Sequence, residues 1–293
     1  MRGNPLHHQM IAPATLDEAL ALLAAEPGEW TPIAGGTELM VAYAAGRLKS
    51  KKLLSLWTLP ELTAISITDG GQVSLGGGVT FAQIRSDPRL QQLFPLLVKA
   101  AAWIGSIANQ SRATLAGNIA NGSPAADAPP ALLVYDAQIE LISQAGKRSI
   151  PYADFHTGYK LNLLRPDEII NAILLQTPKK STHDSLYKVG ARKAMAITKV
   201  ALAGRASLEA GKVVAIRLAA ASLADRPLRL VQTENALRGK TLDDETCRRA
   251  LLALDSEAAP IDDIRSTAAF RRQVAANLLT DFLVTLRSTG ERL

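Results

Sequence analysis

Two short glycine-bearing stretches constrain this chain more than any other feature of its sequence. They are residues 33–38, IAGGTE, and residues 114–127, TLAGNIANGSPAAD. Each combines backbone N–H groups with hydroxyl or amide side chains. Glycines let a backbone lie directly against a ligand, and consecutive N–H groups in such turns form a concavity that suits phosphate oxygens. The pair therefore predicts a pyrophosphate group held from two sides.

The length and composition are those of a globular protein. The 293 residues allow two domains, since domains commonly hold about 100 to 200 residues. Hydrophobic residues make up 47% and charged residues 20%. No apolar run approaches the roughly 18 residues of a membrane-spanning helix, and the N-terminus lacks the layout of a signal peptide. We therefore expect a cytoplasmic protein with no membrane span.

The chain has one cysteine, Cys247. A single cysteine excludes an internal disulfide. It also excludes an iron–sulfur cluster held by this chain alone, because such clusters need about four ligands, mostly cysteines. Redox chemistry here would therefore need an organic cofactor.

The formal net charge is +6, which raises the question of a nucleic-acid partner. The basic residues are scattered, and aromatic residues make up only 4%. Nucleic-acid binding surfaces usually combine a continuous basic groove with stacking aromatics. We therefore expect no nucleic-acid partner, and we interpret the basic run at 49–52 as solvated loop charge.

The first part of the chain predicts a strand–loop–helix unit around the first glycine stretch. Thr15 is suited to cap a helix over 15–23, with Glu18 completing a capping box. A buried strand at 31–34, a helix at 39–45 and a further strand at 52–56 are expected after it.

The middle of the chain predicts antiparallel hairpins, which argue against a purely parallel sheet. Residues 64–76 and 138–151 alternate apolar and polar side chains around glycine turns. Helices are expected at 81–85 and 93–103, and a strand at 168–175.

The last part predicts a hairpin followed by helices. Strands are expected at 201–209 and 212–221, and helical sequence runs from 242 to the end. The polar segment 178–184 is the expected domain boundary. The whole chain is therefore expected to be α+β, with domains at 1–177 and 178–293 and subdomains of the first at about 1–57 and 58–177.

Two common nucleotide-binding patterns are absent from the sequence. The Rossmann fingerprint needs Gly-x-Gly-x-x-Gly between a strand and a helix, with an acidic residue about 20 positions later. The run at 76–78, GGG, ends a hairpin strand and has no acidic residue at that offset. No Walker motif is present either. If the ligand is a dinucleotide, another fold must hold it.

Three motifs, in order, resemble the FAD-binding subunit of molybdenum hydroxylases. They are AGGTE at 34–38, ATLAGNIAN at 113–121 with SPAAD at 123–127, and Tyr187-Lys188 ahead of RKAMAI at 192–197. Within that family the chain is similar to the medium subunit of xanthine dehydrogenase and carbon monoxide dehydrogenase flavoproteins. The similarity covers nearly the whole chain.

The resemblance implies a vanillyl-alcohol-oxidase (PCMH) type FAD-binding domain of two α+β subdomains. A smaller C-terminal α+β domain like that of the carbon monoxide dehydrogenase flavoprotein would follow, with FAD in the crevice between these parts. The residues implied around FAD are Thr31, Pro32, Ile33, Ala34, Gly35, Gly36, Thr37, Glu38, Thr114, Leu115, Ala116, Gly117, Asn118, Ser123, Asp127, Ile170 and Lys188.

Three of these residues carry specific implied roles. Asp127 resembles an acidic residue near the polyol chain of the flavin, Ile170 an apolar residue against the isoalloxazine, and Lys188 a lysine beside it. A lysine there would stabilise negative charge on the reduced flavin and raise its potential. Taken alone, Asp127 could instead cap the helix that follows it, and Lys188 could be a surface charge.

The chain departs from the pattern of its relatives at three places. Gln110-Ser111 replaces a common Arg-Asn pair, and Ala116-Gly117 replaces a double glycine. The added methyl of Ala116 is expected to affect the approach of backbone to phosphate. Ala196 replaces an aspartate common in bacterial relatives, so a role of that carboxylate in acceptor docking is not carried over to this chain.

The function implied by the resemblance is electron relay. A partner subunit with molybdenum cofactor would oxidise the substrate, a [2Fe–2S] subunit would pass the electrons on, and FAD in this chain would deliver them to NAD⁺ or another acceptor. The chain offers no catalytic acid–base pair and no metal site of its own. A free-standing flavoprotein oxidase or reductase on the same fold, or a structural subunit that has lost FAD, are the alternatives.

Overall fold

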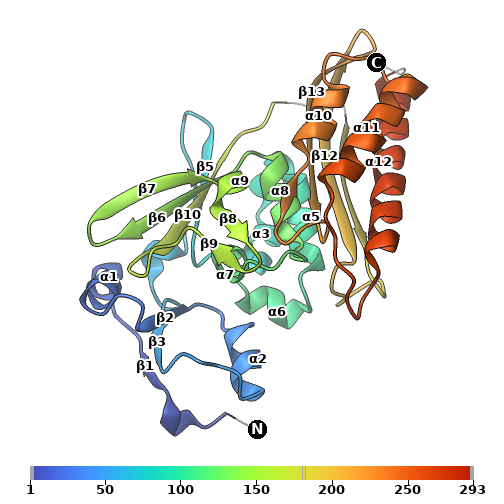
Figure 1. Ribbon diagram of the computed structural model, residues 1–293. Helices are drawn as coiled ribbons and strands as arrows, with labels where there is room; N and C mark the ends of the chain where they lie inside the picture. The colour runs from blue at the N-terminus through green and yellow to red at the C-terminus, as the bar shows by residue number, and fades with distance from the viewer. Residues whose placement is uncertain (1–2, 180, 182, 291–293) are drawn as a thin grey trace.

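The first part of the chain forms a small parallel sheet. The computed structural model describes residues 3–179, 181 and 183–290. Strands β1 (Gln9–Ile11) and β2 (Trp30–Ile33) both pair in parallel with β3 (Lys52–Ser55). Helix α1 (Leu16–Ala25) connects β1 to β2, and α2 (Leu39–Ala44) follows β2. This part lies at the bottom of Figure 1, beside the N-terminus.

Helix α1 begins where the sequence predicts, but one capping bond differs. The Thr15 hydroxyl accepts from the N–H of Glu18, as an N-cap does. The Glu18 carboxylate accepts from the N–H of Ala14 at 2.7 Å. The second half of the predicted capping box is therefore wrong, because the carboxylate reaches one residue beyond the cap.

A five-stranded antiparallel sheet forms the second part, in the order β4-β5-β10-β6-β7. The strands are β4 (Ile65–Ile67), β5 (Gln72–Gly76), β10 (Ile169–Gln176), β6 (Gln138–Ser143) and β7 (Gly146–Pro151). Each predicted hairpin is confirmed, since β4 pairs with β5 and β6 with β7.

Six helices connect β5 to β6, and all of them except α6 contribute side chains to one hydrophobic core with this sheet. They are α3 (Phe81–Ser86), α4 (Pro88–Leu93), α5 (Pro95–Trp103), α6 (Ile107–Arg112), α7 (Leu115–Asn121) and α8 (Ala128–Val134). Short elements complete this half: η1 (Pro5–His7), η2 (Pro60–Leu62), α9 (Tyr152–Phe155), β8 (His156–Gly158) and β9 (Leu161–Asn162).

The triple glycine at 76–78 serves backbone packing. A Cβ atom on Gly76 would lie 2.2 Å from the carbonyl oxygen of Leu62, and one on Gly77 would lie 2.2 Å from that of Ile170. Only residues without a side chain fit between these backbones. The glycines therefore let three segments of the sheet region approach closely, which accounts for them without a nucleotide.

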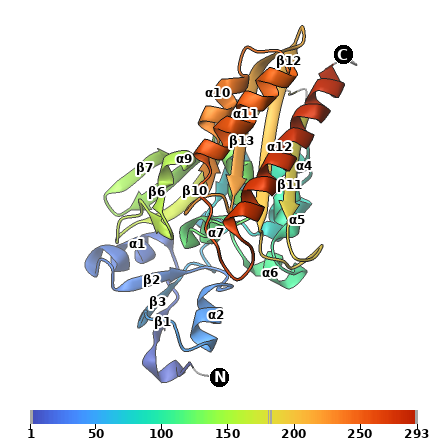
Figure 2. The ribbon, with the colours of Figure 1, turned by 45° about the vertical axis from the view of Figure 1, so that its right-hand side comes forward.

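The C-terminal part is an antiparallel sheet of four strands covered by helices. The strands, in spatial order, are β11 (His183–Val189), β12 (Val200–Glu209), β13 (Lys212–Ala221) and β14 (Leu228–Arg229). The helices are α10 (Val231–Leu237), α11 (Asp244–Glu257) and α12 (Ala268–Gly290). Figure 1 shows α11 and α12 on one side of this sheet and α5 and α8 on the other, and Figure 2 shows α11 and α12 in front of it.

The sheet is consequently buried on both faces. On β12, Ala203 faces the core formed with the five-stranded sheet and helices α5 and α8, whereas Leu202 faces the core under α11 and α12. The same alternation holds on β13 for Ala219 and Ala220. Small residues on the first face allow the helices of the neighbouring part to pack closely, so the two parts share an extensive apolar contact.

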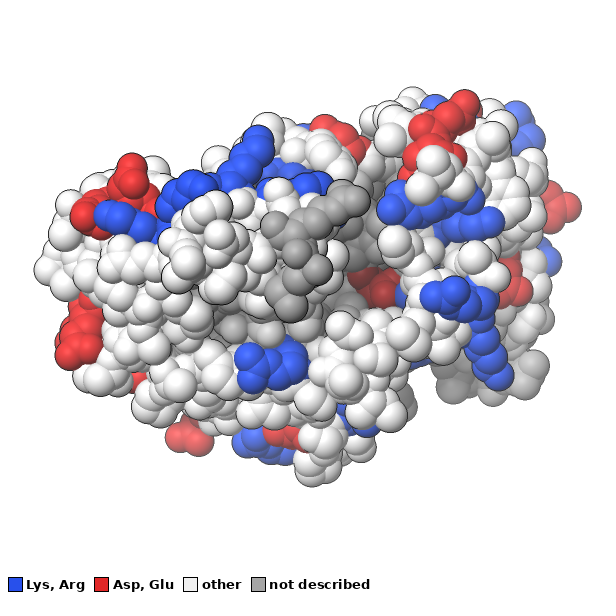
Figure 3. Space-filling view, turned by 90° about the horizontal axis from the view of Figure 1, so that it is seen from below, with Lys and Arg blue, Asp and Glu red and all other residues white. Residues whose placement is uncertain are grey.

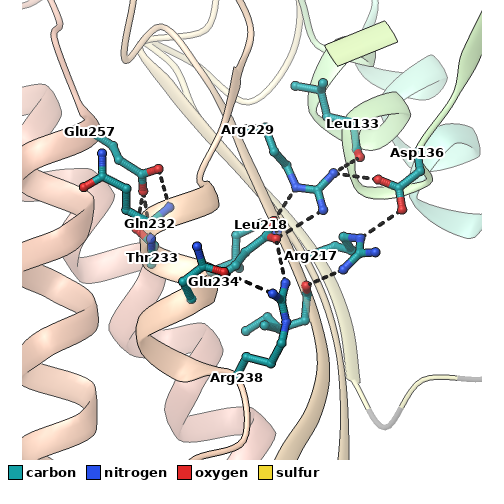
Figure 4. Close-up of polar contacts among 12 residues, drawn as sticks. Leu133, Asp136, Arg217, Leu218, Arg229, Gln232, Thr233, Glu234, Arg238 and Glu257 are labelled. Carbon is teal, nitrogen blue, oxygen red and sulfur yellow. Dashed lines mark hydrogen bonds and ion pairs between the residues drawn. The ribbon is translucent and has the colours of Figure 1, made fainter. Parts of the chain in front are cut away.

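An ion-pair network also joins the two parts (Figure 4). The Arg229 guanidinium donates to the Leu133 carbonyl at 2.8 Å and to the Asp136 carboxylate at 2.7 Å, both at the end of α8. It also pairs with the buried carboxylate of Glu234. Burial acts to raise the pKa of Asp136, but Arg229 and Arg217 outweigh it and leave that pKa below its usual range.

The structure confirms the α+β class and most predicted elements. Three predictions were incomplete. The helix expected at 93–103 is divided at Phe94, before Pro95, and the glycine stretch at 114–127 contains helix α7 where a loop is predicted. Strand β11 begins inside the polar segment taken as a boundary. Among the described residues, no helix combines the length and hydropathy needed to cross a membrane.

Candidate flavin-binding site

The structure brings the first glycine stretch into contact with the residues just before the second. A Cβ atom on Gly35 would lie 1.7 Å from the carbonyl oxygen of Arg112, so the two backbones touch. The Arg112 guanidinium stacks on the Trp57 ring at 3.8 Å, and its Nε lies 3.5 Å from the Gly35 carbonyl oxygen. Arginine stacked on an aromatic ring is held in place, which fixes this junction.

The second glycine stretch begins as a capped helix. The Thr114 hydroxyl accepts from the N–H of Gly117 at 3.0 Å, and α7 runs from there to a left-handed Gly122. Gly117 is exposed, so its backbone is open to a ligand. The Oδ1 atom of Asn118 is buried without a hydrogen-bond partner. Buried polar atoms of native proteins are nearly always satisfied, which makes this atom a candidate ligand contact.

The turn between β8 and β9 lies against both glycine stretches. Lys160 pairs with Glu38 of the first stretch at 3.5 Å. A Cβ atom on Gly122 would lie 3.1 Å from the Lys160 Cα, and Asn162 donates to the Ala120 carbonyl at 3.2 Å. The turn therefore braces the two stretches at the far end of α7 from Gly35.

Asp127 and Lys188 form a buried ion pair. The Lys188 Nζ lies 2.6 Å from Asp127 Oδ2, and each side chain is only 11% exposed. Thr198 donates its hydroxyl to the other oxygen, Oδ1. Burial raises the pKa of Asp127 above its usual range, against the opposing effects of Lys188 and Thr198. The carboxylate makes no capping bond to α8, and Lys188 is not a surface charge, so both alternatives from the sequence fail.

Two residues that depart from the family pattern, Ala116 and Gln110, make contacts within the protein. Ala116 belongs to the hydrophobic core, so its methyl lies on the inner side of α7, while Gly117 next to it is exposed. The Gln110 amide donates to the carbonyls of Ala102 and Ile104 at 3.1 Å each and thereby satisfies the end of α5. These contacts give no reason for either residue to obstruct a ligand.

The remaining predicted residues fall into two groups. Ile33, Leu115 and Ile170 are buried, and Ile170 belongs to the same core as α7. The hydroxyl of Thr31 accepts from Ser50 at 2.7 Å within the small sheet. Glu38 pairs with Lys160, and the Ser123 hydroxyl accepts from the N–H of Ala125 at 3.3 Å. The predicted residues that lie partly or fully exposed along the two stretches are Pro32, Ala34, Gly36, Thr37, Glu38 and Ser123.

Sequence reasoning missed several residues of this region. Trp57 and Arg112 lock the two stretches together, Lys160 braces them, and Thr198 holds Asp127. Arg112 adjoins the second motif, and Thr198 directly follows the RKAMAI motif, so position in the sequence could have indicated both. Trp57 and Lys160 depend on tertiary contacts that no local pattern encodes.

On the face of the described residues seen in Figure 3, basic side chains form no continuous patch. Seen from below, the molecule is hollowed between two masses, and lysine and arginine side chains occur as separate groups among acidic and uncharged ones (Figure 3). That the chain has no nucleic-acid partner stays a prediction.

Two family models together span nearly the whole chain. The FAD binding domain in molybdopterin dehydrogenase matches residues 6–178, and the CO dehydrogenase flavoprotein C-terminal domain matches residues 185–286. The chain therefore belongs to the family of FAD-binding subunits of molybdopterin dehydrogenases, which are oxidoreductase subunits, and FAD is the cofactor of this family's domain. The partnerless Asn118 oxygen and the glycine backbones fit such a group.

Individual relatives resemble the chain over most of their length. The xanthine dehydrogenase FAD-binding subunit of Escherichia coli O157:H7 is 30% identical over 259 residues, 88% of each chain. Among solved structures, carbon monoxide dehydrogenase from Hydrogenophaga pseudoflava superimposes with a TM-score of 0.91 and 26% identity, covering 97% of this chain and 98% of that one. Quinoline 2-oxidoreductase from Pseudomonas putida 86 superimposes with a TM-score of 0.87 and 27% identity, covering 96% of this chain and 97% of that one.

Proposed function

We propose that this chain is the electron-transfer subunit of a cytoplasmic molybdenum-containing hydroxylase. It would receive electrons from the [2Fe–2S] clusters of one partner subunit and deliver them to NAD⁺ or another acceptor, while a second partner with molybdenum cofactor oxidises the substrate. The contact between Gly35 and Arg112, which places the first glycine stretch beside the residues that lead into the second, is the observation that carries the proposal.

The proposed site uses residues of both parts of the chain. The backbone of the two stretches, with Thr37, Thr114 and Asn118, would hold the pyrophosphate and the sugar-like portion of FAD. Asp127 would accept from its hydroxyls, because a carboxylate has about four acceptor positions and only two are used by Thr198 and Lys188. Ile170 would line the ring system. When bound, FAD supplies redox chemistry that no side chain of this chain provides.

Lys188 would set the electrostatic environment of the cofactor. Its ammonium group is held by Asp127 and lies 3.5 Å from the Trp103 carbonyl oxygen, so its position is fixed. A fixed positive charge stabilises negative charge that develops beside it. The paired Asp127 carboxylate opposes this effect, and the balance of the two would tune the potential.

We further propose that residues 1–177 and 178–293 act as separate domains, with subdomains of the first at about 1–57 and 58–177. The cofactor would then lie where these parts meet. The pair of Asp127 and Lys188 supports this arrangement, since one residue comes from each domain.

Purification of the chain alone and with its co-expressed neighbours tests the function. Visible flavin absorbance in both samples, with NAD⁺-dependent turnover only when partners are present, is the expected result. Turnover by the chain alone would instead indicate a free-standing oxidase or reductase. A folded chain without flavin in either sample would indicate a structural subunit.

A further inference from the structure

Ser222 adopts a left-handed backbone conformation with φ of 63° although it is not glycine. Residues with a side chain rarely take this conformation, and when they do the strain often marks a functional site. Ser222 is buried, directly after β13, at the point where the C-terminal sheet meets the second glycine stretch. The contacts of Ser222 must therefore compensate for the backbone strain.

Every polar group of Ser222 is used in this position. Its N–H donates to the Pro124 carbonyl at 2.8 Å, and its hydroxyl donates to the Thr198 carbonyl at 3.0 Å. Its own carbonyl accepts from Arg271 at 3.3 Å, and Arg271 is paired with Asp263. One strained residue thus ties the second glycine stretch to the segment that carries Thr198 and to the start of α12.

Thr198 continues this chain of contacts to Asp127. Its side chain is almost wholly buried, and its hydroxyl donates to Asp127 Oδ1. Asp127 Oδ2 accepts from Lys188. Both oxygens of the carboxylate are therefore oriented by residues that follow the predicted domain boundary, whereas Asp127 itself precedes it.

We propose that Thr198 and Ser222 are positioning residues that orient the Asp127 carboxylate for the hydroxyl groups of the FAD polyol. This inference rests on the proposed function. Thr198 fixes the direction of Asp127 Oδ1. Ser222 holds the backbone carbonyls of both Thr198 and Pro124, and so fixes the two segments that carry Thr198 and Asp127. Through Thr198 and Ser222, the C-terminal domain would help to form the cofactor site although neither residue contacts the cofactor.

Titration of FAD into flavin-free full-length protein tests the inference. Thr198→Val keeps the shape of the side chain and removes the donor, and about tenfold weaker FAD binding is expected, since a hydrogen bond to a charged group is commonly worth at least a factor of ten. Thr198→Ser keeps the donor and should bind FAD as the wild type does. The rescue by serine separates loss of the hydrogen bond from a change in packing.

Thr233 provides a matched control in the same domain. It is also fully buried and donates its hydroxyl to a carboxylate, that of Glu257, at 2.7 Å. Thr233→Val should lower the unfolding temperature while leaving the affinity for FAD unchanged. Ser222→Gly removes the hydroxyl and relieves the backbone strain, so severalfold weaker FAD binding without a lower unfolding temperature is expected.

The outcomes distinguish this inference from the proposed site. Wild-type FAD affinity in Thr198→Val, together with lost affinity in Asp127→Ala, would overturn the positioning role and leave the function standing. Wild-type affinity in Asp127→Ala would overturn the placement of the cofactor beside Asp127, and the positioning role with it. Equal weakening of FAD binding by Thr198→Val and Thr233→Val would also overturn the inference.

Discussion

Gly35 and Arg112, which lie 77 residues apart in the sequence, touch through their backbones, and a Cβ atom on Gly35 would come within 1.7 Å of the Arg112 carbonyl oxygen. The contact joins the first glycine stretch to the residue that precedes Ala113 and the cap of α7. It brings the first motif beside the start of the second, as expected if both hold one pyrophosphate group.

Gly35→Ala should damage this junction. The added methyl overlaps a backbone carbonyl, which cannot rotate away as a side chain could, so we expect a loss of about 1–3 kcal/mol in the free energy of unfolding. FAD affinity should fall at least about tenfold because the two stretches separate. Chemical denaturation and FAD titration measure the two effects. Gly70→Ala is the control, since its Cβ would come no closer than 3.8 Å to another residue and its φ lies outside the left-handed region, as that of Gly35 does.

Asn118→Leu should separate ligand binding from stability. The buried Oδ1 atom has no partner in the protein, and leucine replaces the amide with an apolar group of similar size. Removing an unsatisfied polar atom should leave the free energy of unfolding unchanged or raise it by about 1 kcal/mol. FAD affinity should fall. A marked loss of stability at unchanged affinity would show that the amide serves the fold alone.

The sequence predicts local elements better than the contacts between them. The strand at 31–34, the two hairpins and the long C-terminal helices follow from hydrophobic periodicity and turn residues, and these predictions are confirmed. Helix α7 was missed because Gly117 and Asn118 are weak helix formers, and tertiary packing of Leu115 and Ile119 overrides that preference.

Substitution of Lys188 and Asp127 should move the flavin potential in opposite directions. Lys188→Met removes a positive charge and should lower the midpoint potential, whereas Asp127→Asn removes the opposing negative charge and should raise it. Shifts of the order of 30 mV are expected, which correspond to about 1.4 kcal/mol for a two-electron couple. Spectroelectrochemical titration of the bound flavin measures both. Shifts of the same sign would contradict the electrostatic role.

Glu234→Ala should destabilise the junction of the two domains. The Glu234 side chain is 2% exposed, accepts from the N–H of Leu218 at 2.8 Å and pairs with Arg229. Arg229 keeps Asp136 as a partner in this variant, but the buried N–H of Leu218 loses its acceptor, which commonly costs about 1–3 kcal/mol. Glu245→Ala, at an exposed pair with Arg248, should cost less than about 1 kcal/mol. Similar losses in both variants would argue against a structural role for the network.

His156 should make stability depend on pH between about 6.5 and 4. Burial lowers its pKa to about 4, and its Nδ1 atom is buried without a partner, so the folded protein holds a neutral ring. The unfolded chain binds a proton at a higher pH than the folded one does, so stability is lost as the pH falls through this window. His156→Phe should remove this part of the pH dependence. Unfolding temperatures at several pH values measure it, and parallel curves for both proteins would refute the prediction.

In the candidate site too, the sequence motifs indicate individual residues but not the tertiary contacts between them. The motifs indicated Gly35, Asp127 and Lys188, but their spacing did not indicate that Asp127 pairs with Lys188, which lies 61 residues away. Trp57 and Lys160 carry no motif at all. Their roles depend on how the small parallel sheet and the β8–β9 turn pack against α7, which is decided by the whole fold.

The central claim is that the two glycine stretches form one FAD site. Titration of FAD into the flavin-free wild-type chain, followed by flavin fluorescence, tests it most directly when Gly35→Ala and Asn118→Leu are measured beside it. Saturable binding of one FAD per wild-type chain, weakened in both variants, is the predicted result. Wild-type affinity in both folded variants, or no saturable binding by the folded wild-type chain, would contradict the claim.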